Sequence, residues 1–136
     1  MALPNGAGGY QLGDGNLNEV SLGVQSAPVA LTTGVTLTAA QLTNGLILGS
    51  PGTSAVSYQL PTAADLDTLV SSAKANSSFD FSVVNVDGSS AGVITLTTNT
   101  GWTLVGLMTV VATAGTAQAF RARKTADGAW TLYRLA

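Results

Sequence analysis

The sequence predicts a mainly β fold: an antiparallel β-sandwich or jelly-roll-like domain over residues 29–136, with one short helix and an extended N-terminal arm. Two observations lead to this prediction. After residue 29, apolar and polar residues alternate through many short segments, as in strands that bury one face. Clusters of Gly, Asn, Asp and Ser separate these segments at intervals of about eight to twelve residues, which is typical of sandwiches and barrels. Hydrophobic residues make up 46% of the 136-residue chain, enough to fill one core.

The first 28 residues differ in composition from the rest. They hold six of the sixteen glycines and few apolar residues, so they are not expected to form a core of their own. We interpret residues 1–28 as an arm that becomes ordered against a neighbouring subunit or another surface. Scattered apolar side chains, among them Tyr10, Leu12 and Leu17, would supply its contacts. A disordered tail is the alternative.

The alternation after residue 29 predicts a series of strands. They are expected at residues 32–37, 46–48, 55–60, 79–86, 93–98, 102–105 and 107–112, with a single helical turn at 37–42. The clearest unit is a C-terminal hairpin, in which residues 118–124 pair with 129–135. Asp127-Gly128 in its turn supplies the positive φ angles that a tight connection needs.

One helix is predicted, from Ala63 to about Ala75. Thr62 is a natural N-cap, and Asp65 places a carboxylate in the first turn, where it interacts favourably with the helix dipole. Apolar residues along this segment recur at helical spacing and form one stripe. The predicted core consists of that stripe and of alternating strand residues: Leu66, Leu69, Val70, Phe79, Phe81, Val83, Ile94, Leu96, Phe120, Trp130 and Leu132.

The composition argues against an enzyme. The chain has no His and no Cys, so it lacks a thiolate nucleophile, a soft-metal site and the side chain that most often transfers protons near neutral pH. Ser71-x-x-Lys74 stands without the other elements of serine acyl-enzymes. The segment from Asp14 lacks the Gly and Glu of a calcium loop, and Asp65 and Asp67 point in different directions on a helix. We therefore expect no catalysis, metal, cofactor or small-molecule substrate.

The distribution of charge is more informative than the partial motifs. Residues 1–118 carry six acids and one base, whereas residues 119–136 carry four bases and one acid. Arg121 and Arg123 are expected on one strand face with Tyr133 beside them, and we predict that Arg121, Arg123 and Arg134 dock on an acidic surface. The alternative is solvated charges that protect a sheet edge. A net charge of −2 argues against nucleic-acid binding.

Two further features bear on location. Only 9% of the residues are charged, which suits a protein that packs against copies of itself or a partner. The N-terminus lacks the basic and apolar regions of a secretion signal, and no apolar stretch is long enough to span a bilayer. We therefore expect synthesis in a cytoplasm and no membrane partner.

Several short segments are similar to a pattern found in tailed-phage structural proteins. They resemble small decoration (capsid cement) and head-fibre proteins that are encoded near the major capsid protein, including those of cyanophages. The resemblance covers residues 30–136 and leaves out the arm. The segments are LTAAQL (37–42) with GLIL (45–48), YQLPTAA (58–64), SFDFSV (78–83), TGWTLV (100–105), and FRARK (120–124) through WTLYR (130–134).

The resemblance implies a trimeric β-sandwich or jelly-roll-like module that sits at three-fold positions of a capsid and clamps neighbouring capsomers. We therefore expect a homotrimeric cement protein on the outer surface of the virion, with the major capsid protein and itself as partners. Tyr10, Leu12 and Leu17 of the arm would contact the capsid or a neighbouring subunit. One alternative is a receptor- or glycan-binding module of a head fibre or tail, which would expose aromatics such as Tyr58, Trp102 or Tyr133 on one concave face. A weaker one is a small carboxylate-dependent hydrolase.

Overall fold

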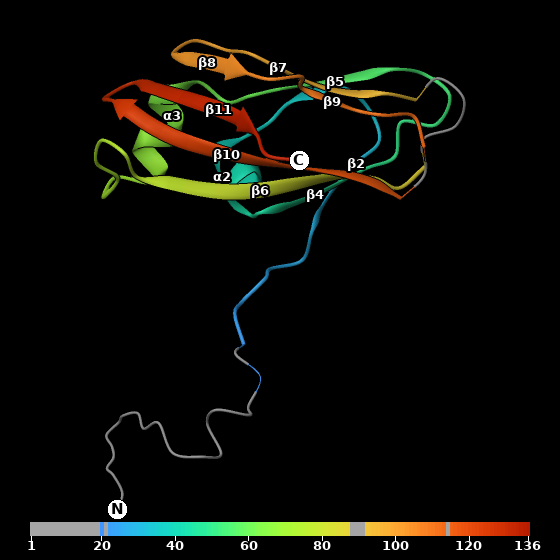
Figure 1. The fold of residues 1–136 in the computed structure, drawn as a ribbon, viewed down its shortest axis with the longest axis horizontal. Helices are drawn as coiled ribbons and strands as arrows, with labels where there is room; N and C mark the ends of the chain where they lie inside the picture. Colours follow the sequence, from blue (N-terminus) through green and yellow to red (C-terminus); the bar gives the residue numbers. More distant parts are fainter. Residues whose placement is uncertain (1–19, 21, 88–91, 114) are drawn as a thin grey trace, which may run out of the picture.

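The computed structural model describes residues 20, 22–87, 92–113 and 115–136. These residues form a mainly β domain with two sheets and two short helices (Figure 1). Residues 22–28 lead away from this domain. A mainly β fold was predicted, and the structure confirms it.

In the first half of the domain the chain alternates between the two sheets. Strands β2 (Val29–Leu31), β4 (Leu46–Gly49) and β6 (Ser78–Asn85) lie parallel in one sheet. Strands β3 (Val35–Thr36), β5 (Val56–Gln59) and β7 (Ile94–Thr97) lie parallel in the other, and they follow β2, β4 and β6 in turn along the chain. The pairs β2–β3, β4–β5 and β6–β7 are therefore three successive coils of a short β-solenoid.

The second half of the domain adds four strands to these coils. Strand β9 (Thr109–Val110) pairs antiparallel with β7, and β10 (Thr116–Ala126) pairs antiparallel with β6. Strand β11 (Ala129–Arg134) forms the predicted hairpin with β10, and β8 (Trp102–Val105) lies parallel to β11 at the sheet edge. The sheet orders are β2-β4-β6-β10-β11-β8 and β3-β5-β7-β9.

The prediction of an antiparallel domain is wrong. Of the eight strand pairings in the described part of the chain, five are parallel and three are antiparallel. Parallel strands need a crossover connection, and in the coils the strand of the opposite sheet lies within that connection. Apolar alternation shows that a strand buries one face, but it carries no information about the direction of its neighbour.

The described residues contain two helices, and the shorter one lies where a single helical turn was predicted at residues 37–42. Helix α2 (Ala39–Thr43) begins with a capping box: the Gln41 backbone N–H donates to the Thr38 hydroxyl at 3.1 Å, and the Thr38 N–H donates to the Gln41 side chain at 2.9 Å. Helix α3 (Ala63–Leu69) begins at Thr62, whose hydroxyl accepts the Asp65 N–H, as predicted.

Helix α3 is six residues shorter than the predicted span to Ala75, because it ends at Leu69. The chain then turns, with the Ala73 N–H bonded to the carbonyl of Val70. Asn76 adopts a positive φ of 73°, and its N–H donates to the Lys124 carbonyl of β10 at 2.8 Å. Tertiary hydrogen bonds to β10 therefore replace the last predicted turns of the helix.

The prediction of the core is right for eight of the eleven residues, which are buried. Val70 and Phe79 are partly buried against the core, and Leu69 is wrong because 49% of it is exposed where the helix ends. The rings of Phe81 and Phe120 stack with centroids 5.4 Å apart across the β6–β10 pair. The eight buried residues are Leu66, Phe81, Val83, Ile94, Leu96, Phe120, Trp130 and Leu132.

Candidate functional site

The outer face of the six-stranded sheet is the candidate functional site. Along β6 and β10 the buried side chains alternate with exposed or half-buried ones, so one face packs on the core and the other faces outward. Register places Asp80 opposite Arg121, Ser82 opposite Ala119 and Val84 opposite Ala117 on this outer face. The rows near the C-terminal end of β10 are charged, and those near its N-terminal end are apolar or small.

Arg121 forms a bidentate ion pair across the β6–β10 strands. Its Nε and Nη2 atoms donate to the two carboxylate oxygens of Asp80 at 2.7 and 2.9 Å. The hydrogen bonds from Arg121 hold the pKa of Asp80 below its usual value, and the carboxylate raises the pKa of Arg121. Both side chains are about half exposed, at 49% and 51%, so the pair is accessible from outside.

Arg123 lies two residues further along the same face. Its Nε donates to the Tyr133 hydroxyl at 3.1 Å, and its Nη1 donates to the Asn76 side-chain oxygen at 2.8 Å. The guanidinium carbon is 5.9 Å from the centre of the Tyr133 ring, within range of a cation–π interaction. In the described part of the chain Arg123 forms no ion pair, so its charge is available to a partner.

The structure does not bring Arg134 into this cluster. Arg134 pairs with Phe120, whose side chain is in the core, so it leaves β11 from the face opposite to Tyr133. Its Nη1 donates to the Leu107 carbonyl at 3.2 Å, beyond the end of β8. The expected grouping of Arg121 and Arg123 with Tyr133 is confirmed, and Arg134 occupies a separate place at the end of the sheet.

The other half of the outer face is an apolar stripe. Register places Ala30, Leu48, Val84 and Ala117 in one row across β2, β4, β6 and β10. Leu46 and Ala119 lie in the next row, on either side of Ser82. Ala30 and Ala117 are exposed, and the others are half-buried. We call these six residues the apolar stripe: Ala30, Leu46, Leu48, Val84, Ala117 and Ala119.

The segment that leads into β2 is attached to the domain at one place. The Gln25 amide donates to both the backbone and the side-chain oxygens of Asn44 at 3.0 Å, and the Asn44 amide donates to the Ala27 carbonyl at 3.1 Å. Upstream of this attachment, Leu22 is 87% exposed and Val24 is 99% exposed. The other predicted contact residues, Tyr10, Leu12 and Leu17, lie outside the described residues.

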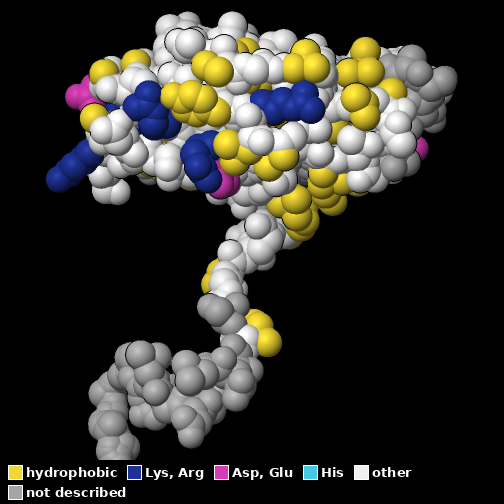
Figure 2. Space-filling model, in the orientation of Figure 1, with side chains coloured by type: hydrophobic (Ala, Val, Ile, Leu, Met, Phe, Trp, Pro, Cys, Tyr) yellow, Lys and Arg dark blue, Asp and Glu magenta, His cyan; other side chains and the backbone are white. Residues whose placement is uncertain are grey.

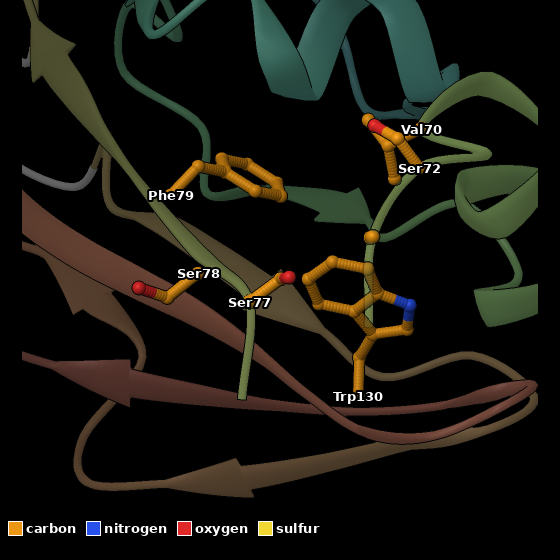
Figure 3. A pocket seen from close by; sticks show the side chains of 7 residues that line it. Val70, Ser72, Ser77, Ser78, Phe79 and Trp130 are labelled. Carbon is orange, nitrogen blue, oxygen red and sulfur yellow. The ribbon is translucent and has the colours of Figure 1, made fainter. Parts of the chain in front are cut away.

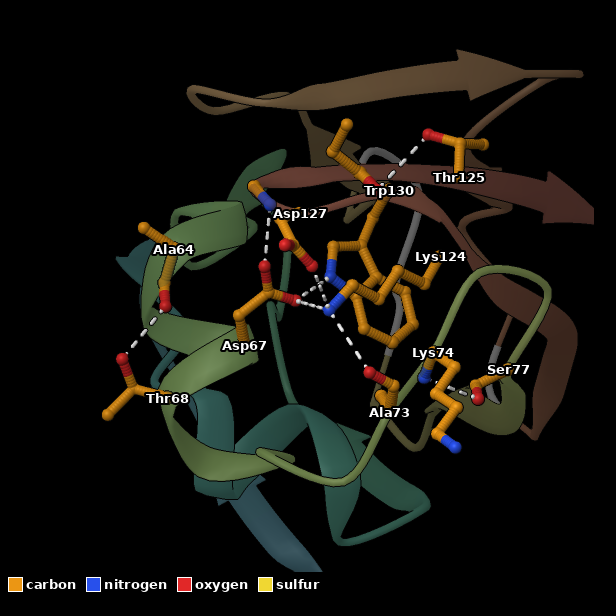
Figure 4. Close-up of polar contacts among 12 residues, drawn as sticks. Ala64, Asp67, Thr68, Ala73, Lys74, Ser77, Lys124, Thr125, Asp127 and Trp130 are labelled. Atoms are coloured by element: carbon orange, nitrogen blue, oxygen red, sulfur yellow. Dashed lines mark hydrogen bonds and ion pairs between the residues drawn. The ribbon is translucent and has the colours of Figure 1, made fainter.

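A polar cluster beneath the hairpin has a structural role (Figure 4). Lys124 is only 5% exposed, and its ammonium lies 3.2 Å from Asp67 of α3 and 3.1 Å from Asp127. Asp67 also accepts the Trp130 indole N–H at 2.8 Å and the Gly128 backbone N–H at 2.6 Å. Burial works to raise the pKa of Asp67, but these hydrogen bonds and Lys124 outweigh it and keep the pKa low. The cluster ties α3 to the hairpin.

A small cavity lies beside this cluster, between the end of α3 and the start of β6 (Figure 3). Its volume is about 220 Å³, and its lining includes Phe79, Trp130, Val70 and Ser77. The volume is below the range of about 300–1,000 Å³ that is usual for small-molecule sites. The Ser77 hydroxyl already accepts the Lys74 backbone N–H at 2.9 Å. The small volume of the cavity therefore argues against a small-molecule site here.

The structure also bears on the alternative functions. Of the three aromatics expected on a glycan-binding surface, Tyr58 is fully buried and Trp102 is 8% exposed. Tyr133 is partly exposed on the outer face, beside Arg123. Ser71 and Lys74 lie in the turns after α3 rather than on one helix, so the helical geometry of an S-x-x-K pair is not formed. Within the described ranges, no group of three or more His, Cys, Asp or Glu residues is placed to hold a metal ion.

Comparisons with known proteins add no family assignment. No family model, curated protein or solved structure matches the chain. No helix in the described part of the structure is long and apolar enough to cross a membrane.

The apolar stripe is the part of the site that the sequence analysis missed. Its residues come from four strands, and each strand shows only one or two of them at alternate positions. Alternation could have identified Leu46 and Leu48 as sharing one face of a strand. The stripe itself depends on strand order and register, which no local pattern in the sequence specifies.

Proposed function

We propose that this chain is a virion structural protein that binds the outer surface of a tailed-phage capsid as a homotrimer and stabilises the shell. The observation that carries the proposal is the outer face of the six-stranded sheet, where an apolar stripe lies beside the half-exposed Arg121 and the partly buried Arg123. A face of this kind, open to a partner, favours a binding role over a catalytic one.

The composition of the surface supports the same role. With 9% charged residues, the chain has few charges to keep an exposed apolar face soluble. Figure 2 shows basic side chains spread over the part of the domain formed by β10 and β11, and hydrophobic side chains gathered where the N-terminal segment leaves the domain. Binding to a shell through many copies would make weak individual contacts sufficient, because the copies act together.

The two sheets share one core, and a compact β module of this kind supports the proposal of a protein seated on a shell. In the proposed arrangement the major capsid protein is the partner, and Arg121 and Arg123 face acidic groups of the shell. Electrostatic attraction of this kind speeds and orients binding, and salt weakens it. The chain would thus be located on the outside of the virion.

The test is binding of the purified chain to expanded shells of the virus that encodes it. We expect co-sedimentation at saturable occupancy, and a higher temperature of DNA release from shells that carry the protein. The double variant Arg121→Glu/Arg123→Glu should bind much more weakly, because it replaces attraction with repulsion. Lys74→Glu is the matched control, since it reverses one charge in the turn after α3. A chain that ignores both expanded and unexpanded shells would refute the proposal.

A further inference from the structure

The apolar stripe lacks a covering element among the described residues, although it lies in the larger of the two sheets. Four of its six residues form one continuous row from the edge strand β2 to β10. The alternate positions of the same strands, such as Ile47 and Val83, are fully buried against the core. The sheet is therefore packed on one face, and half of its other face is apolar without a cover. Such a face favours association.

The segment that precedes β2 has the complementary pattern. Val20, Leu22 and Val24 occupy alternate positions and are 80%, 87% and 99% exposed. In an extended chain, alternate side chains point to the same side. These three apolar side chains therefore lie along one side of the segment. The segment makes no hydrogen bond upstream of Gln25 among the described contacts. It has the pattern of a half-buried strand, but nothing in its own domain buries it.

The described residues of the arm do not cover the stripe of their own copy, since Val20, Leu22 and Val24 are almost fully exposed. The contacts of Gln25 and Asn44 fix the end of the arm beside the C-terminus of α2. From that point the segment leads away from the domain (Figure 1). The 24 residues before Gln25 span up to about 80 Å when extended, whereas a domain of this size is about 30–35 Å across. The arm is therefore long enough to cross a neighbouring copy.

The distribution of charge also favours the outer face of the sheet as the surface that binds the arm. Residues 1–28 contain Asp14 and Glu19 and no Lys or Arg. The stripe adjoins Arg121 and Arg123 on the same outer face, and Arg123 forms no ion pair in the described part of the chain. An apolar and acidic arm thus matches an apolar and basic face.

We propose that the N-terminal arm of one copy lies across the outer face of the six-stranded sheet of a second copy. Its apolar residues, Leu22 and Val24 among them, cover the apolar stripe, and the neighbouring rows with Arg121 and Arg123 stay accessible to the shell. The contact joins two different surfaces, arm and face, so it is heterologous, and with a three-fold rotation between copies it closes into a ring of three. This inference deepens the proposed function and rests on its homo-oligomer.

The absence of Cys from the chain allows a direct test on the isolated protein. Two single-cysteine variants, Val24→Cys and Ala117→Cys, are made with tags of different mass, mixed and oxidised. We expect a disulfide-linked species containing one chain of each kind, because Val24 of one copy lies near Ala117 of the next. Thr103→Cys replaces Ala117→Cys as the control, since Thr103 is exposed on the far edge strand β8 of the same sheet.

The outcomes separate this inference from the proposed function. Equal crosslinking to Thr103→Cys, or crosslinking of Val24→Cys only to itself, would overturn the arm exchange. Native mass spectrometry should show a trimer for the full chain and a monomer for Leu22→Asp/Val24→Asp, with Ser26→Asp as the matched control. A trimer that survives the double substitution would also overturn it. If the double variant stays trimeric but no longer binds shells, the arm contacts the capsid instead, and the proposed function stands.

Discussion

At the scale of single residues, two of the three ion-paired aspartates, Asp67 and Asp80, differ in their surroundings. Asp67 has a side-chain exposure of 19% and accepts hydrogen bonds from an indole, a backbone N–H and the nearly buried Lys124. Asp80 has an exposure of 51% and a single partner, Arg121. Exposed ion pairs contribute little to stability, whereas a buried group that loses a charged partner is costly. The two residues therefore form a matched pair for mutation.

We predict that Asp67→Asn lowers the free energy of unfolding by about 2 kcal/mol, because it weakens three interactions and leaves Lys124 with only one carboxylate. Asp80→Asn should lower it by less than about 1 kcal/mol. Urea denaturation followed by tryptophan fluorescence measures both, since Trp130 donates to Asp67. Equal effects of the two substitutions would contradict a structural role for the cluster beneath the hairpin.

The same cluster predicts a dependence on pH. The pKa of Asp67 is lower in the folded chain than its ordinary value of 3.8, so its stabilising contribution is complete above that value. It is lost as the pH falls through the lower pKa of the folded state. The difference in stability between the wild type and Asp67→Asn should therefore be constant above about pH 5 and shrink below about pH 4. A difference that grows on acidification would show that the carboxylate is not ionised in the folded state.

At the scale of elements, the sequence predicted local structure better than it predicted how elements far apart in the chain pair with one another. The caps at Thr62 and the hairpin turn at Asp127-Gly128 are local, and both are confirmed, with Gly128 at a φ of 70°. The predicted end of α3 was wrong because residues far away in the sequence decide where the helix ends. The Lys124 carbonyl accepts the Asn76 N–H, and the Lys124 ammonium donates to the Ala73 carbonyl. Strand direction was wrong for the same reason.

The site follows the same rule. Arg121, Arg123 and Tyr133 lie on two strands of one hairpin, so their proximity follows from a local register and was predicted. The apolar stripe forms only when four strands lie in the correct order and register. Arg134 is the next residue after Tyr133 on β11, so its side chain lies on the opposite face of the sheet from Arg121 and Arg123. Features that depend on one hairpin are therefore accessible from sequence, and those that depend on the whole sheet are not.

One connection between elements is tight enough for a specific prediction. Gly101, before β8, has a φ of +88°, and a Cβ there would collide with the Gly128 carbonyl oxygen and lie 2.5 Å from the Ala63 side chain. Gly52 has a similar φ of +67° but open space around it. We predict that Gly52→Ala costs about 1 kcal/mol from backbone strain alone. Gly101→Ala should cost at least about 2 kcal/mol more, because α3 and the hairpin must also move apart.

Thermal unfolding of the two alanine variants, followed by circular dichroism, compares these costs. Gly52→Ala is the control: both glycines have a positive φ, so the difference between the two variants reports the steric collision at Gly101 alone. A melting temperature of Gly101→Ala equal to that of Gly52→Ala would mean that α3, the β7–β8 turn and the hairpin do not pack as closely as described.

At the scale of the whole molecule, strand order predicts where the structure opens first. Strands β6 and β10 lie in the middle of the six-stranded sheet and are paired on both sides. Strand β2 has three residues and lies at the edge. Among the described residues, the segment before it is hydrogen-bonded to the domain through Gln25 and Ala27. Local opening costs least where few contacts hold the backbone. Amide exchange should therefore be slowest in β6 and β10 and fastest in residues 22–31.

The concentration dependence of this exchange pattern connects the fold to the proposed assembly. If arms are exchanged between copies, amides of residues 22–28 gain protection as the protein concentration rises, because the segment is then held against a neighbour's sheet. Exchange in β6 and β10 should stay unchanged, since their hydrogen bonds are formed within each copy. The variant Leu22→Asp/Val24→Asp should keep fast exchange in this segment at every concentration, while its β6 and β10 remain as protected as in the wild type. Fast exchange of residues 22–28 in the concentrated wild type would mean that the arm stays free, and the cover of the apolar stripe would then have to be the face of another domain.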